Sequence, residues 1–190
     1  MIKSARQTKN QPDSKIKAAI RTINDFPKKG IKFRDIAPLL ADPALTKRMV
    51  ALICAGFGKP GASGKTAVDK VVGIESRGFV IGAMAAQNLG VGFVMARKKG
   101  KLPGKVIAKE YGLEYGTACL ELQRDCIKNG EAILIIDDVL ATGGTVQAVT
   151  DMVRSQGGRV VGIRFLIDLT YVPKIAGLDL DSDVKSLIEL

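Results

Sequence analysis

The sequence predicts one α/β domain built on a mostly parallel sheet flanked by helices. Its 190 residues are 46% hydrophobic and 25% charged, which is enough for one full hydrophobic core. Short runs rich in Val and Ile alternate with segments of helical periodicity, and this alternation favours parallel strands joined by helices. Two of the runs end in glycine-containing polar loops, so candidate ligand groups lie at the carboxyl ends of strands.

The chain begins with residues 1–12, which are polar and basic and have no apolar centre. We expect a loose tail there, not a signal peptide, and a single domain over residues 13–190. Residues 78–96 carry no charge, but Gln87, Asn88 and four glycines argue against a membrane span. A buried helix followed by a buried strand fits this segment better, and no membrane association is expected.

Two helices are predicted ahead of the sheet, one from the spacing of Ile16, Ala19, Ile20 and Ile23 before Pro27, the other from Leu45, Met49, Leu52 and Ile53. Strands are predicted at 68–74, 91–97, 117–122, 132–136 and 160–167. Helices are predicted at 78–89 and 144–156, the second ending at Gly157 and Gly158. The last residues, DVKSLIEL, predict a final short strand.

The segment AILIIDDVLATGGT, residues 132–145, carries the strongest signal of function. An apolar strand ends in Asp137 and Asp138, whose carboxylates can accept hydrogen bonds from vicinal sugar hydroxyls. The following loop contains Ala141, Thr142, Gly143, Gly144 and Thr145 and opens a helix. Small residues at a helix start let backbone N–H groups close around a phosphate, so this segment suits a sugar phosphate. It lacks both the G-x-G-x-x-G spacing and the G-K-[ST] ending of nucleotide-binding loops.

A second anion site is indicated by VVGIESRGFVIGA, residues 71–83. Backbone N–H groups of Ser76, Arg77 and Gly78 are exposed at a predicted helix start, where an anion is favoured. The alternative is an ordinary turn with a solvated Arg77.

Residues 97–116, RKKGKLPGKVIAKEYGLEYG, form a third segment of interest. Six Lys and Arg residues crowd it between glycines and a proline, so we expect a mobile basic loop or ribbon, as a lid over a pyrophosphate would need. A solvated charged hairpin is the alternative.

In a fourth segment, residues 25–40, Pro27 and Gly30 impose a turn and Phe33 offers an aromatic face between Lys32 and Arg34. Considered alone, Phe33 fits a place in the hydrophobic core better than a ligand contact.

Histidine is absent from the chain, which excludes histidine-based nucleophiles, acid–base pairs and zinc sites. Cys54, Cys119 and Cys126 are odd in number and show no C-x-x-C spacing, so neither a disulfide framework nor a thiolate metal cluster is expected. Reduced thiols in a cytoplasmic protein are the simpler interpretation.

These four segments together resemble the type I phosphoribosyltransferases, over roughly residues 15–170, and most closely the adenine-specific members of that family. The resemblance implies the family's fold, with a small hood mainly over residues 25–40 plus the C-terminal segment, and a flexible lid loop. It implies a purine-salvage enzyme that joins adenine to phosphoribosyl pyrophosphate, giving AMP and pyrophosphate. It also implies Mg²⁺ as cofactor, held mainly by the substrate rather than directly by protein, and a homodimer.

The resemblance also implies a role for particular residues. Asp137 and Asp138 would hold the ribose, and Ala141 to Thr145 the 5-phosphate. The pyrophosphate would be bound by Glu75, Ser76, Arg77, Arg97 and Lys101, with Arg97 able to reach a neighbouring subunit's site, and the bond from Glu75 to Ser76 is often cis in the family. Lys32, Phe33 and Arg34 would recognise adenine. Glu114 would be the catalytic acid and base for the purine, and Tyr115 would help close the lid.

Net charge leaves a choice of partners open. The chain carries +10, and its first fifty residues hold 12 Lys and Arg against 4 Asp and Glu. A basic half can indicate nucleic acid, but a sugar pyrophosphate also demands a positive site, and we expect no nucleic-acid partner.

Two alternative functions remain: transfer to another base (hypoxanthine, guanine, xanthine or orotate), and a non-catalytic regulator that senses phosphoribosyl pyrophosphate. Hypoxanthine–guanine enzymes carry a catalytic aspartate where this loop has Ala141, which favours adenine.

Overall fold

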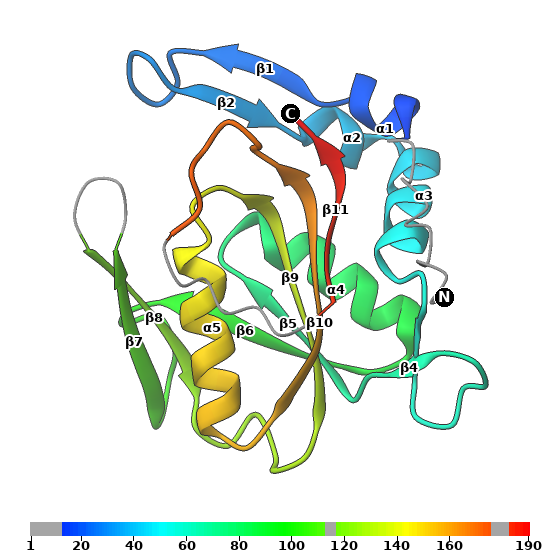
Figure 1. Ribbon diagram of the computed structural model, residues 1–190, viewed down its shortest axis with the longest axis vertical. Coiled ribbons are helices and arrows are strands. Elements are labelled where there is room, and N and C mark those ends of the chain that lie inside the picture. Colours follow the sequence, from blue (N-terminus) through cyan, green and yellow to red (C-terminus); the bar gives the residue numbers. More distant parts are fainter. Residues whose placement is uncertain (1–12, 113–116, 176–182) are drawn as a thin grey trace, which may run out of the picture.

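The computed structural model describes residues 13–112, 117–175 and 183–190, and a seven-stranded sheet forms its centre (Figure 1). The strand order is β11-β10-β9-β5-β6-β8-β7. Five strands run parallel: β5 (Lys70–Ile74), β6 (Gly92–Lys98), β9 (Ala132–Leu140), β10 (Arg159–Asp168) and β11 (Val184–Glu189). The antiparallel hairpin of β7 (Val106–Gly112) and β8 (Thr117–Gln123) completes one edge. The predicted mostly parallel α/β sheet is therefore confirmed.

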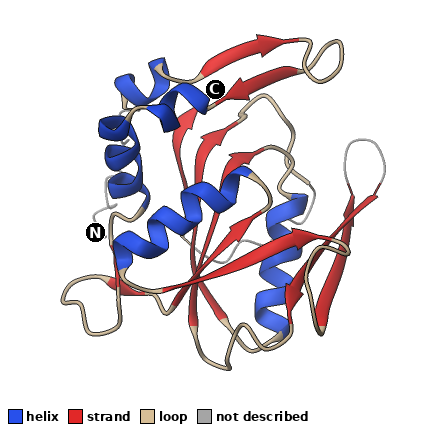
Figure 2. Cartoon of the chain, turned by 180° about the vertical axis from the view of Figure 1, so that it is seen from behind, coloured by secondary structure: helices blue, strands red, loops and turns tan. Residues whose placement is uncertain are grey.

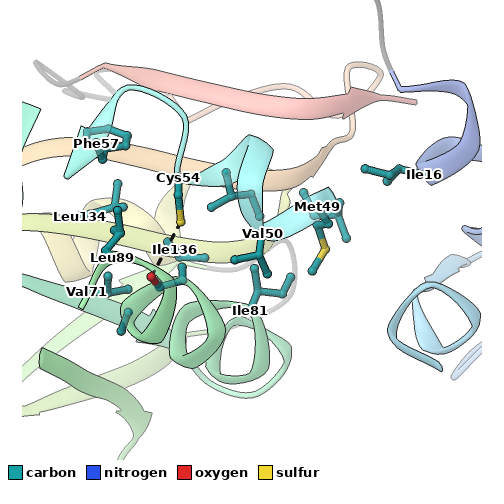
Figure 3. Packing of buried hydrophobic residues seen from close by; sticks show 14 of the residues in the cluster. Ile16, Met49, Val50, Cys54, Phe57, Val71, Ile81, Leu89, Leu134 and Ile136 are labelled. Atoms are coloured by element: carbon teal, nitrogen blue, oxygen red, sulfur yellow. Dashed lines mark hydrogen bonds between the residues drawn. The ribbon is translucent and has the colours of Figure 1, made fainter. Parts of the chain in front are cut away.

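Helices cover both faces of the sheet because its central strands are apolar on both sides (Figure 2). On one face, Leu134 and Ile136 of β9 pack with α3 (Pro43–Ile53) and α4 (Arg77–Leu89). On the other, Ile133 and Ile135 pack against α5 (Gly144–Ser155). Figure 3 shows the first of these cores, in which the buried Cys54 Sγ lies 3.8 Å from the carbonyl oxygen of Ala85.

Helix α4 lies unusually close to the sheet at its amino end. A Cβ added to Gly73 would meet the Phe93 ring at 2.7 Å and the carbonyl oxygen of Gly78 at 2.9 Å. A Cβ added to Gly78 would lie 2.8 Å from Asp137 Oδ1. Glycine at both positions lets the start of α4 approach the end of β9, and this brings two of the predicted anion-binding loops together.

The hood is a separate two-stranded antiparallel sheet, β1 (Arg21–Asn24) and β2 (Lys32–Asp35). Short helices precede and follow it, α1 (Ser14–Ala18) and α2 (Ala37–Ala41). The predicted helix through Ile23 is wrong in its second half, because α1 ends at Ala18 and Ile23 pairs with Phe33 across the hairpin. That long-range pairing overrides the local helical spacing, and an Arg21–Asp35 ion pair of 2.5 Å joins the same two strands.

The other predicted strands and helices are present, with shifts of a few residues at their ends. Sequence reasoning missed β7, which pairs along its whole length with β8, and the short parallel pair β3 (Phe57–Gly58) and β4 (Thr66–Ala67). The predicted final strand is β11; it pairs in parallel with β10 and forms the other edge of the central sheet. The carbonyl oxygen of Glu189, near its end, accepts a hydrogen bond from Lys17 Nζ next to the hood. In the described part of the chain, no helix has both the length and the apolar character needed to cross a bilayer.

Candidate functional site

A cavity of about 570 Å³ opens at the carboxyl ends of β9 and β10, between the central sheet and the hood. This is where open α/β sheets bind ligands. Its walls come from four places: the hood, the end of β9, the loop that opens α5, and the segment after β10. The lining residues that matter below are Gly30, Ile31 and Lys32; Asp137; Ala141, Thr142, Gly143 and Thr145; and Leu169, Tyr171 and Val172.

The loop between β9 and α5 provides the cavity floor. Gly143 adopts φ 91°, a left-handed conformation that favours glycine, and the twelve-residue helix α5 begins directly after it. The N–H groups at this helix start have no partners within the helix, so they favour an anion. The carbonyl oxygen of Thr142 accepts a hydrogen bond of 2.9 Å from the N–H of Ile175, which joins the loop to the segment after β10. The structure thus places four of the five predicted phosphate-loop residues on the cavity wall, with Gly144 starting the helix behind them.

Asp137 and Asp138 are both nearly buried, with 9% and 7% of their surface exposed. The N–H of Asp138 donates to Asp137 Oδ1 at 2.8 Å. Burial raises the pKa of Asp137 well above its ordinary value of 3.8, and the charge of Asp138 raises it further. Burial also raises the pKa of Asp138, although the Arg77 guanidinium opposes that rise. The pair therefore ionises with difficulty unless positive charge or hydroxyl donors are close.

Arg77, at the start of α4, connects three parts of the site. Its Nη2 lies 2.7 Å from Asp138 Oδ2, its Nη1 donates to the carbonyl oxygen of Arg34 at 2.8 Å, and its Cζ lies 4.8 Å from the centre of the Phe33 ring. The sequence predicted Arg77 as a pyrophosphate contact. The structure adds a link between Asp138, predicted to bind the ribose, and the hood, and no local sequence pattern indicates this link.

Glu75 lies two residues before Arg77 and faces the basic end of β6 and the turn that follows. Its Oε1 lies 2.6 Å from Lys101 Nζ, and its Oε2 accepts the N–H of Lys98 at 3.0 Å and lies 3.4 Å from Arg97 Nε. The peptide bond between Glu75 and Ser76 is cis. Burial raises the pKa of the Glu75 carboxyl, but the Lys101 ammonium and the Lys98 N–H outweigh burial and hold it below its ordinary value. Three predicted pyrophosphate residues, Glu75, Arg97 and Lys101, are thus in direct contact.

The three predicted adenine residues lie on β2, but they face different ways. Lys32 lines the cavity together with its neighbours Gly30 and Ile31. Phe33 is outside the cavity lining, between Arg77 and the Phe26 ring, whose centre is 5.1 Å away. Arg34 hydrogen-bonds to Thr22 across the hairpin. In this arrangement Gly30, Ile31 and Lys32 of the hood border the cavity, and Phe33 does not.

Sequence reasoning missed the segment after β10. Leu169, Tyr171 and Val172 form the wall beside the phosphate loop, and Tyr171 is 57% exposed. Lys174 holds this segment in place: its Nζ lies 2.7 Å from Asp168 Oδ1 and 3.1 Å from the carbonyl oxygen of Leu169. The available signal was position alone, since a residue directly after a parallel strand lies at the carboxyl edge of the sheet.

Glu114 and Tyr115 lie outside the described residues, between β7 and β8. The described part of this hairpin lies against α5. Lys109 Nζ lies 3.1 Å from Asp151 Oδ2, and a Cβ on Gly144 would be 3.0 Å from the carbonyl oxygen of Gly112. The base of the predicted lid therefore lies beside the predicted phosphate loop.

Comparison with known proteins agrees with this arrangement. The phosphoribosyl transferase domain family matches residues 62–185. An adenine phosphoribosyltransferase of Geotalea daltonii is 52% identical over 157 residues, covering 83% of this chain and 88% of that protein. The chain belongs to the adenine phosphoribosyltransferase family.

Solved structures extend the likeness to the whole domain. The crystal structure of adenine phosphoribosyltransferase from Thermoanaerobacter pseudethanolicus is 44% identical, with a TM-score of 0.83 over 93% of this chain and 98% of that one. The Saccharomyces cerevisiae enzyme, solved with an imino-altritol bisphosphate and adenine, is 32% identical, with a TM-score of 0.79 over 92% of this chain and 97% of that one. These matches confirm the predicted type I phosphoribosyltransferase fold and make the chain a transferase of the adenine phosphoribosyltransferase family.

Proposed function

We propose that the protein transfers the 5-phosphoribosyl group of phosphoribosyl pyrophosphate to N9 of adenine, releasing pyrophosphate and forming AMP for purine salvage. The observation that carries this proposal is one cavity that brings together the loop at the start of α5, a buried carboxylate and residues of a separate hood. Phosphate, sugar and base would then occupy successive parts of one pocket. Membership of the adenine phosphoribosyltransferase family supports adenine as the base.

Each part of the substrate meets a different group of residues in this proposal. Ala141 to Thr145 would surround the 5-phosphate with N–H groups at the start of α5. Asp137 and Asp138 would accept hydrogen bonds from the ribose hydroxyls. The N–H groups at Ser76 and the side chains of Arg77, Arg97 and Lys101 would bind the pyrophosphate.

The base would lie under the hood, read by main-chain groups around Lys32, Phe33 and Arg34. The hydrophobic surface of Leu169, Tyr171 and Val172 borders the same cavity and would pack against the purine. Phe33, held by Arg77, would support the hood strand in its place over the base.

The chemistry at C1 of the ribose would pass through an oxocarbenium-like state, as in other glycosyl transfers. The protein's contribution would then be positioning and charge stabilisation, by Asp137 and Asp138 next to the sugar and by Arg77 next to the leaving group. Glu114, on the lid, would manage the proton of the purine, with Tyr115 helping to close the lid. With no histidine in the chain, a carboxylate is the residue type best suited to that step.

Magnesium fits the donor groups at this edge of the sheet. Carboxylate oxygens are hard ligands, and Asp138 Oδ2 is nearly buried and accepts no hydrogen bond, although it pairs with Arg77. We propose that Mg²⁺ is held mainly by substrate oxygens and water, with Asp137 and Asp138 oriented toward that shell. When bound, it would neutralise charge on the leaving pyrophosphate.

We also propose a homodimer in the cytoplasm. Val80 on α4 is 46% exposed and Met95 on β6 is 40% exposed. Met95 lies two residues before Arg97, and Arg97 Cζ lies 6.0 Å from the centre of the ring of Phe79, the neighbour of Val80. We propose that these apolar side chains belong to one surface between subunits. A second subunit covering it would bring Arg97 to the subunit boundary. The three cysteines, Cys54, Cys119 and Cys126, are free thiols, as expected in a reducing compartment.

One turnover assay tests the proposed reaction. Adenine, hypoxanthine, guanine, xanthine and orotate would each be supplied with phosphoribosyl pyrophosphate and Mg²⁺, and the nucleotide formed would be quantified. We expect AMP from adenine and little product from the other bases. Faster turnover of another base would contradict the proposed specificity, and binding of phosphoribosyl pyrophosphate without turnover of any base would identify a regulator instead.

A further inference from the structure

Glu75 is a carboxylate at the centre of a site proposed for an anion. Its side chain is only 8% exposed, and the groups around it are cationic or N–H donors from the end of β6 and the turn that follows. A carboxylate facing a bound pyrophosphate would repel it, so a simple contact with the anion does not explain this residue. Its three contacts indicate instead that Glu75 binds and orients the cations of this segment.

The contacts of Glu75 fall into two kinds. The bond from the Lys98 N–H at 3.0 Å fixes the main chain where β6 ends. The Lys101 Nζ at 2.6 Å and the Arg97 Nε at 3.4 Å are charged partners, and both belong to side chains that the proposed function assigns to pyrophosphate. The Lys101 side chain is 49% exposed, so its ammonium has room to move to another anion.

A second buried carboxylate fixes the same segment from the other side. Glu121 on β8 is 6% exposed, and its Oε2 accepts the N–H of Gly100 at 2.9 Å. Glu75 and Glu121 thus hold the main chain on both sides of Lys99. Arg97 Nη1 also donates to the carbonyl oxygen of Lys101 at 3.0 Å, which closes the turn. These bonds preorganise the turn. The Lys101 ammonium is held differently, because its described partner is the Glu75 carboxylate and not a main-chain group.

We propose that Glu75 is a positioning residue that occupies Lys101 and Arg97 in place of pyrophosphate, and that pyrophosphate and Glu75 exchange for these cations as substrate binds and product leaves. This inference rests on the proposed function, because it assumes that pyrophosphate binds beside Ser76. Glu75 keeps the cations in place before binding and offers them an alternative partner afterwards. The affinity for the product pyrophosphate is therefore lower than the two cations alone would give.

Two substitutions separate the charge of Glu75 from its hold on the main chain. Glu75→Gln keeps an oxygen that can accept the Lys98 N–H but removes the competing charge. We expect it to bind inorganic pyrophosphate more tightly, by roughly two- to tenfold, as one partly screened unit charge at this range would give. Product inhibition by pyrophosphate should strengthen by the same factor. Glu75→Ala loses the main-chain bond as well and should bind more weakly than Glu75→Gln.

Glu131→Gln is the matched control. Glu131 lies at the opposite end of the sheet, also holds a lysine (Lys70 Nζ at 2.9 Å) and also accepts a main-chain N–H, from Lys128. The substitution changes the net charge equally, and its pyrophosphate affinity should equal that of the unmodified protein.

Calorimetric titration of the full-length protein and its three variants with pyrophosphate and Mg²⁺ measures all four affinities. Unchanged or weaker binding in Glu75→Gln would overturn the exchange, as would an equal gain in Glu131→Gln, and equal binding by the Gln and Ala variants would overturn the main-chain role. If the unmodified protein bound no pyrophosphate at all, the proposed function would fail instead, which is a separate result.

Discussion

Arg77 Nη2 lies 2.7 Å from Asp138 Oδ2, so the start of α4 and the end of β9 meet through an ion pair. The same guanidinium donates to the carbonyl oxygen of Arg34 and lies over the Phe33 ring. A planar guanidinium can satisfy these three directions at once, whereas an ammonium group cannot. One side chain therefore joins the proposed sugar site to the hood that is proposed to cover the base.

Arg77→Lys should weaken both substrates, because lysine keeps the charge but loses the simultaneous contacts. Losing one charge-assisted hydrogen bond, ~1.5–3 kcal/mol, corresponds to about tenfold or more for each substrate. Binding of adenine and of phosphoribosyl pyrophosphate would be titrated separately, with Arg159→Lys, at the far end of the sheet, as the control. A loss confined to phosphoribosyl pyrophosphate would show that Arg77 does not support the hood.

Asp137→Asn should stabilise the fold at neutral pH while impairing function. Because burial raises the pKa of Asp137 in the folded state, the folded protein holds its proton to higher pH than the unfolded chain does. Stability is therefore lost as pH rises from the ordinary value of 3.8 through the raised value. The gain from asparagine should be larger at pH 8 than at pH 5, measured by urea unfolding at each pH. A gain that shrank as the pH rose would contradict the raised pKa.

Replacing Asp137 and Asp138 together by Asn should strongly weaken phosphoribosyl pyrophosphate. Each charge-assisted hydrogen bond to a sugar hydroxyl is worth ~1.5–3 kcal/mol, so the combined loss should exceed about a hundredfold. Binding would be followed by calorimetry, with circular dichroism to verify folding. Unchanged affinity in a folded double variant would exclude this placement of the ribose.

Gly143→Val should abolish phosphate binding, because Gly143 has φ 91° and a β-branched residue would distort the loop. Gly130→Val is the matched control, since Gly130 has φ 83° in a turn at the opposite end of the sheet. Thr142→Val should also abolish it, by removing a hydroxyl donor without altering shape. Titration with phosphoribosyl pyrophosphate measures all three. Normal binding by either loop variant would require another site for the 5-phosphate.

Glu114→Gln should lower turnover while leaving sugar binding nearly intact. Glutamine keeps the shape of the side chain but cannot carry a proton, and general acid–base help is worth ~10²–10⁴ in rate. Single-turnover AMP formation and phosphoribosyl pyrophosphate affinity would be measured together. If the chemical rate stayed normal, proton handling would belong to the main chain or to water.

The strand–loop–helix units of this chain could be predicted from sequence because their signals are local. The run from Ala132 to Thr145 contains its own strand, its carboxylates and its helix start, and the structure reproduces all three. The hood could not be predicted in the same way. Ile23 fits a helical spacing with Ile16, yet its partner in the structure is Phe33, ten residues further along. Local periodicity carries no information about such pairing.

The candidate site shows the same difference between local features, which could be predicted, and long-range contacts, which could not. Loops beside a strand were predicted as anion sites, but the ion pairs between them were not. Glu75 and Lys101 lie 26 residues apart, and Arg77 and Asp138 are further apart still. Spacing along the chain cannot indicate that such residues meet. The contact between Glu75 and Lys101 was accordingly missed, although both residues were predicted to belong to the pyrophosphate site.

The hood shares no strand pairing with the central sheet, since β1 and β2 pair only with each other among the described residues. Side chains such as Ile31 can thus change without disturbing the ladder that carries Asp137 and the phosphate loop. A library randomised at Ile31 and Lys32 would keep Gly30, whose φ is 89°, and the Phe33 and Arg34 contacts to Arg77. We expect it to alter the choice of base while the affinity for phosphoribosyl pyrophosphate stays constant. Under the proposed function, the sheet would hold the group that is transferred and the hood would hold its acceptor, so a new acceptor could evolve by remodelling one exposed hairpin.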